Sequence, residues 1–302
     1  SLSGRRRVFI RCTDRALDGV RPLEGSRFMQ CVVFPKFFQE LSAAELAESL
    51  RDIGFDGVDV MLRDGYWVEA GSVAAQLPQF VSVMHDFGLT AENATTPYLD
   101  PNDPYVEREV ACLAENGVRQ FRLEHMRYEG AGTYRKALDA ARRKLEVFAA
   151  MGERHGIRAF IQTHGGSIHP SASASLRLVD GFDPLYVGVH HDPGNMICQE
   201  GYENWVMGID ILGDYLCMVG VKNAGVFQRP AGATFEMRWS REWTTLAEGV
   251  VDYAAVLGAL NDVGFDGPLC MHNFYDRGIE ALTEQTANDL AYLRRLIRQT
   301  GT

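Results

Sequence analysis

Short apolar runs recur along this chain roughly every 30 to 40 residues, and stretches with helical amphipathic periodicity separate them. A strand that is covered on both faces shows such an unbroken apolar run, so the runs predict buried strands. These strands are expected at 28–34, 57–61, 89–94, 118–123, 157–162, 185–190, 215–222 and 268–273. The amphipathic stretches predict helices at 42–53, 72–87, 103–116, 134–155, 171–181, 198–212, 244–263 and 277–299.

The boundaries of several predicted helices carry their own signals. Ser42-Ala-Ala-Glu45 is a capping-box sequence, in which the Ser and Glu side chains bond reciprocally to backbone N–H groups. Glycines that can adopt the left-handed conformation follow other helices and precede the next strand. They are Gly54, Gly88, Gly117, Gly156 and Gly264.

Eight strand–helix units in one chain predict an α/β fold, a closed parallel (β/α)₈ TIM barrel. A doubly wound open sheet usually has fewer units, and no GxGxxG follows the first strand to suggest a dinucleotide fold. No low-complexity linker divides the chain. We therefore expect a single domain over 28–302, preceded by an irregular N-terminal arm at 1–27.

Composition narrows the class of partner. The net charge of −10 and the absence of a basic run beyond residues 5–7 disfavour nucleic-acid binding. No apolar stretch approaches the roughly 20 residues of a membrane span, and Arg6-Arg7 lacks the apolar segment of an export signal. The six cysteines form no CxxC pair and lie mostly in apolar contexts. Buried free thiols in the reducing cytoplasm are therefore expected.

A barrel of this kind carries its chemistry at the C-terminal ends of the strands. Titratable and amide side chains gather at these predicted ends, and four of the eight histidines lie at the ends of the fifth, sixth and eighth strands. The set is Asp59, Glu92, Asn93, Glu124, His125, Gln162, His164, His190, His191, Asp192, Asn195, Lys222, Asn223, His272 and Asn273. We expect these residues to converge on one mouth of the barrel.

The most informative segment is 187–195 (VGVHHDPGN), where an apolar strand runs into two imidazoles and a carboxylate. These groups suit metal binding or acid–base chemistry. Asp192 can equally form an Asx turn that caps the next segment. Since successive strand side chains alternate, at most one of His190 and His191 faces the site.

Other candidates also have a structural alternative. Lys222, one of four lysines, can hold a substrate oxygen, stabilise an enolate, or pair with Asp192. Two glycines follow His164 and permit close approach of a ligand, although they also suit an ordinary loop. Glu92 and Glu124 are possible bases or members of a structural network. The loop aromatics Tyr66, Trp67, Trp239 and Trp243 suit either a wall around a substrate or an oligomer contact.

Together these pieces resemble the xylose isomerase-like TIM barrels, a group of sugar isomerases and epimerases. The resemblance extends over about residues 28–297, and its order and spacing are more specific than any single motif. It rests on GFDGVD at 54–59, GIRAFIQTH at 156–164, VGVHHDPGN at 187–195, VGVKN at 219–223 and GFDGPLCMH at 264–272.

The resemblance implies a divalent metal site made of Glu on strand 5, Asp on strand 6, His on strand 7 and Glu on strand 8. This chain keeps only the Asp, as Asp192; Gln162, Gly220 and His272 stand at the other positions. The usual Mn²⁺ or Mg²⁺ site thus loses charge. In the epimerases of this group the two Glu also transfer protons, which Gln162 cannot do.

Two readings of the site follow. A rearranged site would use Asp192, His164, His272 and Gln162 as ligands, with Glu124 nearby, and its nitrogen-rich ligation would suit Zn²⁺, Fe²⁺ or Mn²⁺, with Mg²⁺ also considered. Otherwise the metal is absent, and Lys222 polarises a carbonyl while His272 moves the proton. Three candidate ligands at one mouth favour the first.

We therefore expect a cytoplasmic enzyme that acts on a sugar, polyol or related hydroxy-carbonyl compound through an enediolate, by isomerisation, epimerisation or dehydration. The expected catalytic residues are His272, Lys222 and Glu124, and the expected substrate-binding residues are Glu92, His191, Asn195 and Asn223. A non-catalytic binding barrel or complex subunit is the alternative. A metal-dependent nuclease of the same barrel group is disfavoured by the charge, and a homo-oligomer is plausible.

Overall fold

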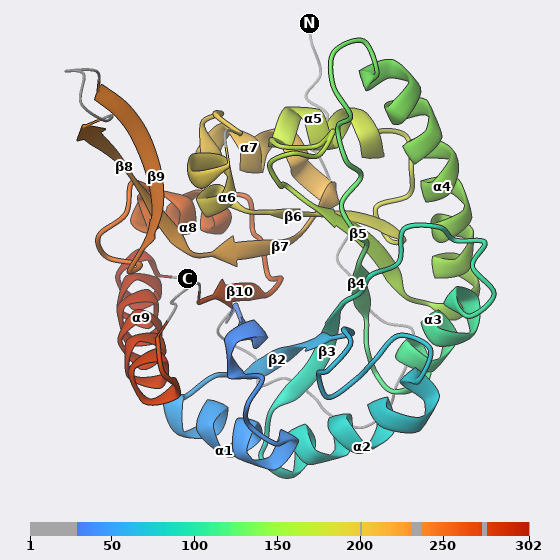
Figure 1. Cartoon of the computed structure of the whole chain (residues 1–302), viewed down its shortest axis with the longest axis horizontal. Helices are drawn as coiled ribbons and strands as arrows, with labels where there is room; N and C mark the ends of the chain where they lie inside the picture. Colours follow the sequence, from blue (N-terminus) through green and yellow to red (C-terminus); the bar gives the residue numbers. More distant parts are fainter. Residues whose placement is uncertain (1–28, 200, 231–236, 274–276, 302) are drawn as a thin grey trace, which may run out of the picture.

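The computed structural model describes residues 29–199, 201–230, 237–273 and 277–301, so the N-terminal arm at 1–27 lies outside the described residues. Eight parallel strands close into a barrel in the order β1-β10-β7-β6-β5-β4-β3-β2 (Figure 1). Their bounds are β1 Cys31–Phe34, β2 Gly57–Met61, β3 Thr90–Thr95, β4 Gln120–Arg122, β5 Arg158–Gln162, β6 Val187–His191, β7 Leu216–Val221 and β10 Leu269–His272. The predicted TIM barrel is confirmed, and each predicted strand overlaps an observed one.

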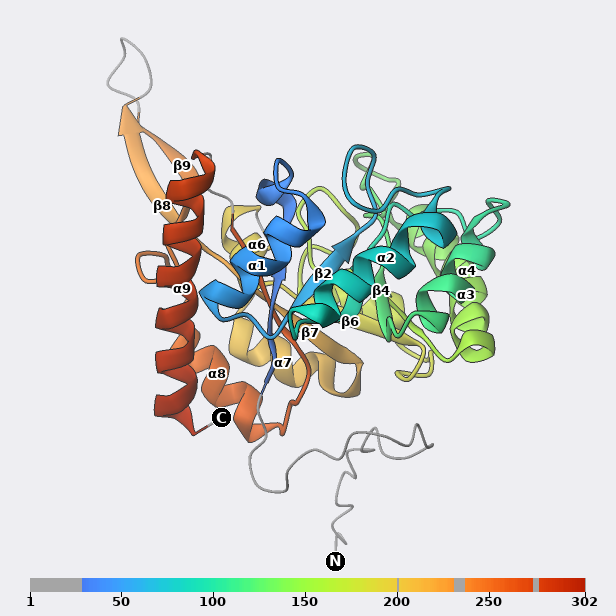
Figure 2. The same ribbon diagram turned by 90° about the horizontal axis from the view of Figure 1, so that it is seen from below.

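Helices surround the barrel and cover its outer face (Figures 1 and 2). Their bounds are α1 Ala43–Ile53, α2 Val73–Asp86, α3 Val106–Glu115, α4 Tyr134–His155, α5 Ala172–Val179, α6 Pro193–Cys198, α7 Trp205–Leu212, α8 Tyr253–Asp262 and α9 Ile279–Thr300. Short 3₁₀ turns lie at Lys36–Phe38 and Gly213–Tyr215. The capping box of α1 is confirmed, since the Ser42 N–H donates to Glu45 Oε2 at 2.8 Å. Gly54 ends α1 with a φ of 100°, a conformation that favours glycine.

Strand side chains that point outward pack against the helices, while those that point inward fill the barrel. Val32, Phe160, Met218 and Cys270 point inward and form, with Cys217, a separate buried cluster. This apolar layer supports the polar strand ends above it, as the ring of Phe160 lies 6.0 Å from that of His190. The polar strand ends at the mouth therefore pack on a layer of buried, mostly apolar side chains.

Two predicted helices are wrong at their boundaries. The helix expected at 198–212 begins only at Trp205, because α6 ends at Cys198 and Asn204 caps a new helix by accepting a hydrogen bond from Met207 N–H. The helix expected at 244–263 begins only at Tyr253, where Asp252 caps it through Ala255 N–H. In both cases a polar capping side chain within the stretch offers the backbone an alternative to continuing the helix.

Residues 223–244, expected as a loop, instead form the antiparallel strands β8 Asn223–Pro230 and β9 Met237–Thr244. This ribbon projects from the barrel beside α9 (Figures 1 and 2). An Arg229–Glu242 ion pair at 2.8 Å joins its strands. The outer part of β8 is exposed throughout, so no alternation of buried and exposed positions marks it as a strand. Among the described helices, none has the length and apolarity to cross a membrane.

The base of the ribbon is tied to the barrel by Asn223. Its amide donates to the carbonyls of Leu246 at 2.9 Å and Val251 at 3.0 Å, and its Oδ1 accepts the N–H groups of Ala224 and Val251, both at 2.9 Å. All four hydrogen bonds are buried, and they use the whole donor and acceptor capacity of the side chain.

We predict that Asn223→Ala lowers the free energy of unfolding by about 2–4 kcal/mol, because it leaves several buried backbone groups unpaired. Urea denaturation followed by circular dichroism measures this change. Asn102→Ala is the control, since Asn102 is exposed and bonds only to Asp100. Equal effects of the two substitutions would contradict a structural role for Asn223.

Candidate active site

The alternation of strand side chains sorts the predicted residues into two groups. Residues two positions apart share a face, so His190 points into the barrel together with Asp192, and Lys222 together with Gly220. Three predicted substrate-binding residues lie at the alternate strand positions, whose side chains point away from the barrel interior. Glu92 pairs with Arg119 on the outside at 3.1 Å, and Nε2 of His191 lies 3.1 Å from the carbonyl oxygen of Trp205 in α7. The side chain of Asn223 bonds to backbone groups at the base of the β8–β9 ribbon. The structure therefore places none of the three in the mouth.

Asp192 follows the last residue of β6 and is the N-cap residue of α6. Its Oδ1 accepts the Asn195 N–H at 2.9 Å, and its own N–H donates to Thr163 Oγ1 at 2.8 Å. The Asn195 amide in turn donates to the Thr163 carbonyl at 2.9 Å. The Asx cap considered from the sequence is therefore confirmed, and it holds the carboxylate in a fixed orientation at the mouth.

The second oxygen of Asp192 accepts two more hydrogen bonds. Oδ2 lies 2.9 Å from Lys222 Nζ and 2.6 Å from Gln162 Nε2, and all three side chains are buried. Burial alone would raise the pKa of Asp192, but the Lys222 ammonium brings that pKa below its usual value. The pKa of Lys222 is lowered by burial and supported by Asp192. The salt bridge foreseen as one alternative for Lys222 is confirmed.

The Lys222 ammonium also faces an imidazole and an indole. Nζ lies 3.5 Å from Nδ1 of His272 and 5.1 Å from the ring centroid of Trp243 on β9. An ammonium over the face of an indole is a favourable cation–π arrangement. Burial and the nearby ammonium lower the pKa of His272 well below its usual value, so this imidazole is neutral near pH 7.

His190, Asp192 and His272 come together at the mouth, each offering one donor atom within 4.8 Å of the others. Sequence reasoning missed His190 as a member of this set, although its spacing of two from Asp192 was the signal. His164, the expected ligand, instead stacks on His125 at 3.8 Å, and its Nδ1 lies 2.7 Å from the Gly165 carbonyl oxygen. Gln162 acts as a donor to Asp192 rather than as a ligand.

This trio matches a divalent cation in spacing but does not fit one in charge. Its one carboxylate is already paired with an ammonium and an amide donor. A divalent ion bound to Asp192 would lie next to the Lys222 ammonium in a buried place, where repulsion between like charges is little screened. The residues present therefore do not fit a metal ion while the Lys222 ammonium holds this position.

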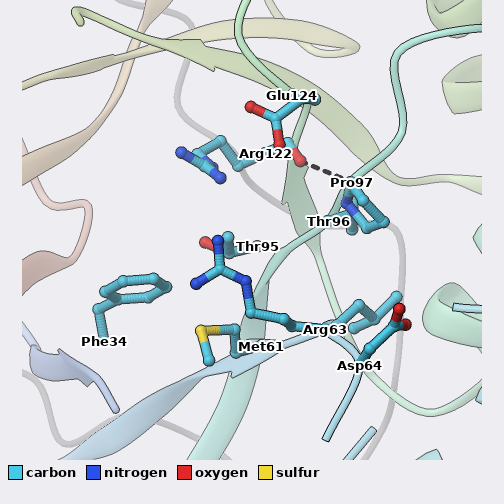
Figure 3. Close-up of a pocket in the computed structure, with 10 residues that line it drawn as sticks. Phe34, Met61, Arg63, Asp64, Thr95, Thr96, Pro97, Arg122 and Glu124 are labelled. Carbon is cyan, nitrogen blue, oxygen red and sulfur yellow. Dashed lines mark hydrogen bonds between the residues drawn. The ribbon is translucent and has the colours of Figure 1, made fainter. Parts of the chain in front are cut away.

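A cavity of about 180 Å³ opens beside this cluster, over the ends of β1 to β4 (Figure 3). Its lining is formed by Phe34, Met61, Leu62, Arg63, Asp64, Thr95, Thr96, Pro97, Arg122 and Glu124. Phe34 stacks on His272 at 4.9 Å, and Arg122 donates to Gln162 Oε1 at 3.0 Å. These two contacts connect the cavity to the Lys222–Asp192 pair. Arg122 was missed from the sequence because a strand arginine commonly faces solvent.

Comparison with known proteins agrees with this architecture. Residues 47–296 match the family described as xylose isomerase-like TIM barrel. The chain belongs to this family. No curated protein sequence matches it at a significant level.

Several solved structures share the fold at low identity. A xylose isomerase-like TIM barrel protein from Mycobacterium smegmatis, in complex with magnesium, is 15% identical with a TM-score of 0.66, covering 92% of this chain and all of its own. The 3-keto-D-glucoside 4-epimerase from E. coli is 14% identical with a TM-score of 0.64, covering 89% and 100%. A probable 3-DHS dehydratase from Bacillus anthracis is 13% identical with a TM-score of 0.66, covering 87% and 99%.

Asp59, in the middle of β2, is buried, and its Oδ2 accepts hydrogen bonds from Thr95 Oγ1 at 2.7 Å and from Cys270 Sγ at 3.9 Å. Burial raises its pKa from 3.8 to about 6. The folded protein therefore binds this proton more tightly than the unfolded chain does. The resulting stabilisation is fully present below about pH 4 and is lost as the pH rises through 6.

We predict that Asp59→Asn, which cannot ionise, removes this loss. Relative to the parent protein, its free energy of unfolding should rise by up to about 3 kcal/mol between pH 4 and pH 8. Urea denaturation at the two pH values measures the difference. Asp103→Asn, at an exposed position, controls for loss of a carboxyl group. A difference that does not change with pH would contradict the raised pKa.

Proposed function

We propose that this barrel catalyses proton transfer next to the carbonyl group of a sugar, polyol or related hydroxy-carbonyl compound, through an enediolate. The observation that carries the proposal is the buried Lys222 ammonium beside the neutral His272 imidazole, whose ring stacks on Phe34 in the wall of the cavity. The ammonium supplies positive charge where the substrate oxygen becomes an anion, and the imidazole accepts the proton.

Glu124 provides a second proton-transfer group across the mouth. It follows the end of β4, which lies opposite β10 in the strand order, so Glu124 and His272 come from opposite sides of the barrel. One Glu124 oxygen accepts the His125 N–H at 2.7 Å, which orients the carboxyl group at the cavity wall. Groups on two faces of one carbon suit epimerisation or isomerisation, in which one removes a proton and the other returns it.

The cavity lining suits an oxygen-rich substrate. Arg122 and Arg63 present guanidinium groups, and Thr95 presents a hydroxyl, toward a space walled on one side by the Phe34 ring (Figure 3). Two solved structures with this fold are an epimerase that acts on a 3-keto-glucoside and a probable dehydratase. Both reactions are consistent with a common enediolate, which either regains a proton or expels a hydroxyl group. We favour reprotonation because Glu124 and His272 come from opposite strands of the barrel.

The test is hydrogen exchange in D₂O, followed by NMR, with a panel of ketohexoses, 3-keto-glucosides and inososes. We expect deuterium to enter next to the carbonyl of one class, and His272→Gln to slow this exchange by at least about 100-fold. His155→Gln is the control, since His155 lies at the outer end of α4 beside Glu107. Glu124→Gln should retain exchange at His272 and lose product formation.

Equal exchange rates for His272→Gln and His155→Gln would contradict the role of His272. No exchange with any member of the panel would count against the enzyme and favour the alternative of a non-catalytic binding barrel.

A further inference from the structure

The departures from the family's ligand pattern share one property, since each accommodates the Lys222 ammonium. At position 162 the amide Nε2 donates to Asp192 Oδ2 at 2.6 Å while Oε1 accepts from Arg122. A Glu in the same place would bring a second carboxylate against Asp192, which one monovalent ammonium cannot neutralise. With the neutral Gln at position 162, the single carboxylate of Asp192 is balanced by the single ammonium of Lys222.

The glycine at position 220 leaves the space that the Asp192 carboxylate occupies. Gly220 faces into the barrel, and a Cβ atom there would lie 2.7 Å from Asp192 Oδ2 and 2.8 Å from His190 Nε2. No side chain, and therefore no histidine ligand, fits at this position while the other two residues keep their places. The Asp192 carboxylate uses the freed space beside β7 and reaches Nζ of Lys222 two residues further along.

The ribbon completes the surroundings of the ammonium. Trp243 on β9 presents its ring 5.1 Å from Nζ, and the Lys222 backbone is fixed by Tyr253, whose Oη accepts the Lys222 N–H at 3.0 Å. A carboxylate, an imidazole and an indole thus all lie close to the ammonium. These groups form a binding site for a cation, and the cation is the Lys222 ammonium of the same chain.

We propose that the Lys222 ammonium is a permanent substitute for the divalent cation of this fold, and that it excludes metal ions from the His190–Asp192–His272 cluster. The part of this inference that assigns Lys222 to charge stabilisation during catalysis rests on the proposed function. The exclusion of metal does not, because it depends only on the contacts at Asp192.

Removing the ammonium should therefore create a metal site. The experiment titrates the purified full chain with Co²⁺, whose visible spectrum reports ligation by histidine and distinguishes it from thiolate ligation. We expect Lys222→Met to bind one equivalent of Co²⁺ through nitrogen and oxygen ligands, at least about 100-fold more tightly than the parent protein. Lys222→Met/Gln162→Glu adds an anionic ligand and should bind at least about tenfold more tightly again.

Three controls assign the binding. Lys136→Met removes an exposed lysine on α4 and should behave as the parent protein. Lys222→Arg keeps a positive charge and should not take up Co²⁺. Lys222→Met/Asp192→Asn should lose the new site. If Lys222→Met is unstable because Asp192 has lost its partner, Co²⁺ should raise its melting temperature while leaving that of the parent protein unchanged.

Two results would overturn the inference: one equivalent of Co²⁺ bound equally well by the parent protein and Lys222→Met, or neither binding nor thermal rescue of Lys222→Met by Co²⁺. Both are read without a substrate. A failure of the exchange experiment therefore leaves this inference standing, and the reverse also holds.

Discussion

The arrangement of the mouth depends on one buried ion pair, between Lys222 and Asp192. Removal of two charges from water costs more than their attraction returns, unless further hydrogen bonds complete the site. Here the carboxylate also receives donors from Gln162 and from the first turn of α6. The ion pair thereby links β5, β6, β7 and α6. A barrel that binds a metal ion uses an external charge for this purpose, whereas here both charges are covalently part of the chain.

This difference affects what must be in place before the substrate arrives. The cation is present as soon as the chain has folded, and the apolar layer of Val32, Phe160 and Met218 supports it from below. Imidazoles whose pKa values burial lowers surround the ammonium without adding charge. An active site in which the dipoles and charges are already oriented needs little reorganisation when charge develops on the substrate.

The fold could be predicted from the sequence because eight apolar runs alternate with eight amphipathic stretches, and glycines and a capping box mark several of the boundaries between them. Asp192, Lys222 and His272 could be placed at the mouth for the same reason. Glu92 and His191 were assigned to the mouth from proximity in sequence, although strand alternation places them outside. The ribbon and the orientation of His164 depend on contacts with distant segments, which no local pattern records. Arg122 is ordinary in sequence and becomes distinctive only through its position inside the barrel.

Gly220 has a consequence for how this site can change over generations. A side chain at that position collides with both Asp192 and His190, so a single substitution there cannot restore the missing ligand. A substitution at position 220 first requires the Asp192 carboxylate to move away. This movement breaks the ion pair with Lys222 and leaves a buried charge without a partner. The arrangement around Lys222 is therefore easier to keep than to change, and relatives with Gly at this position are expected to have the lysine as well.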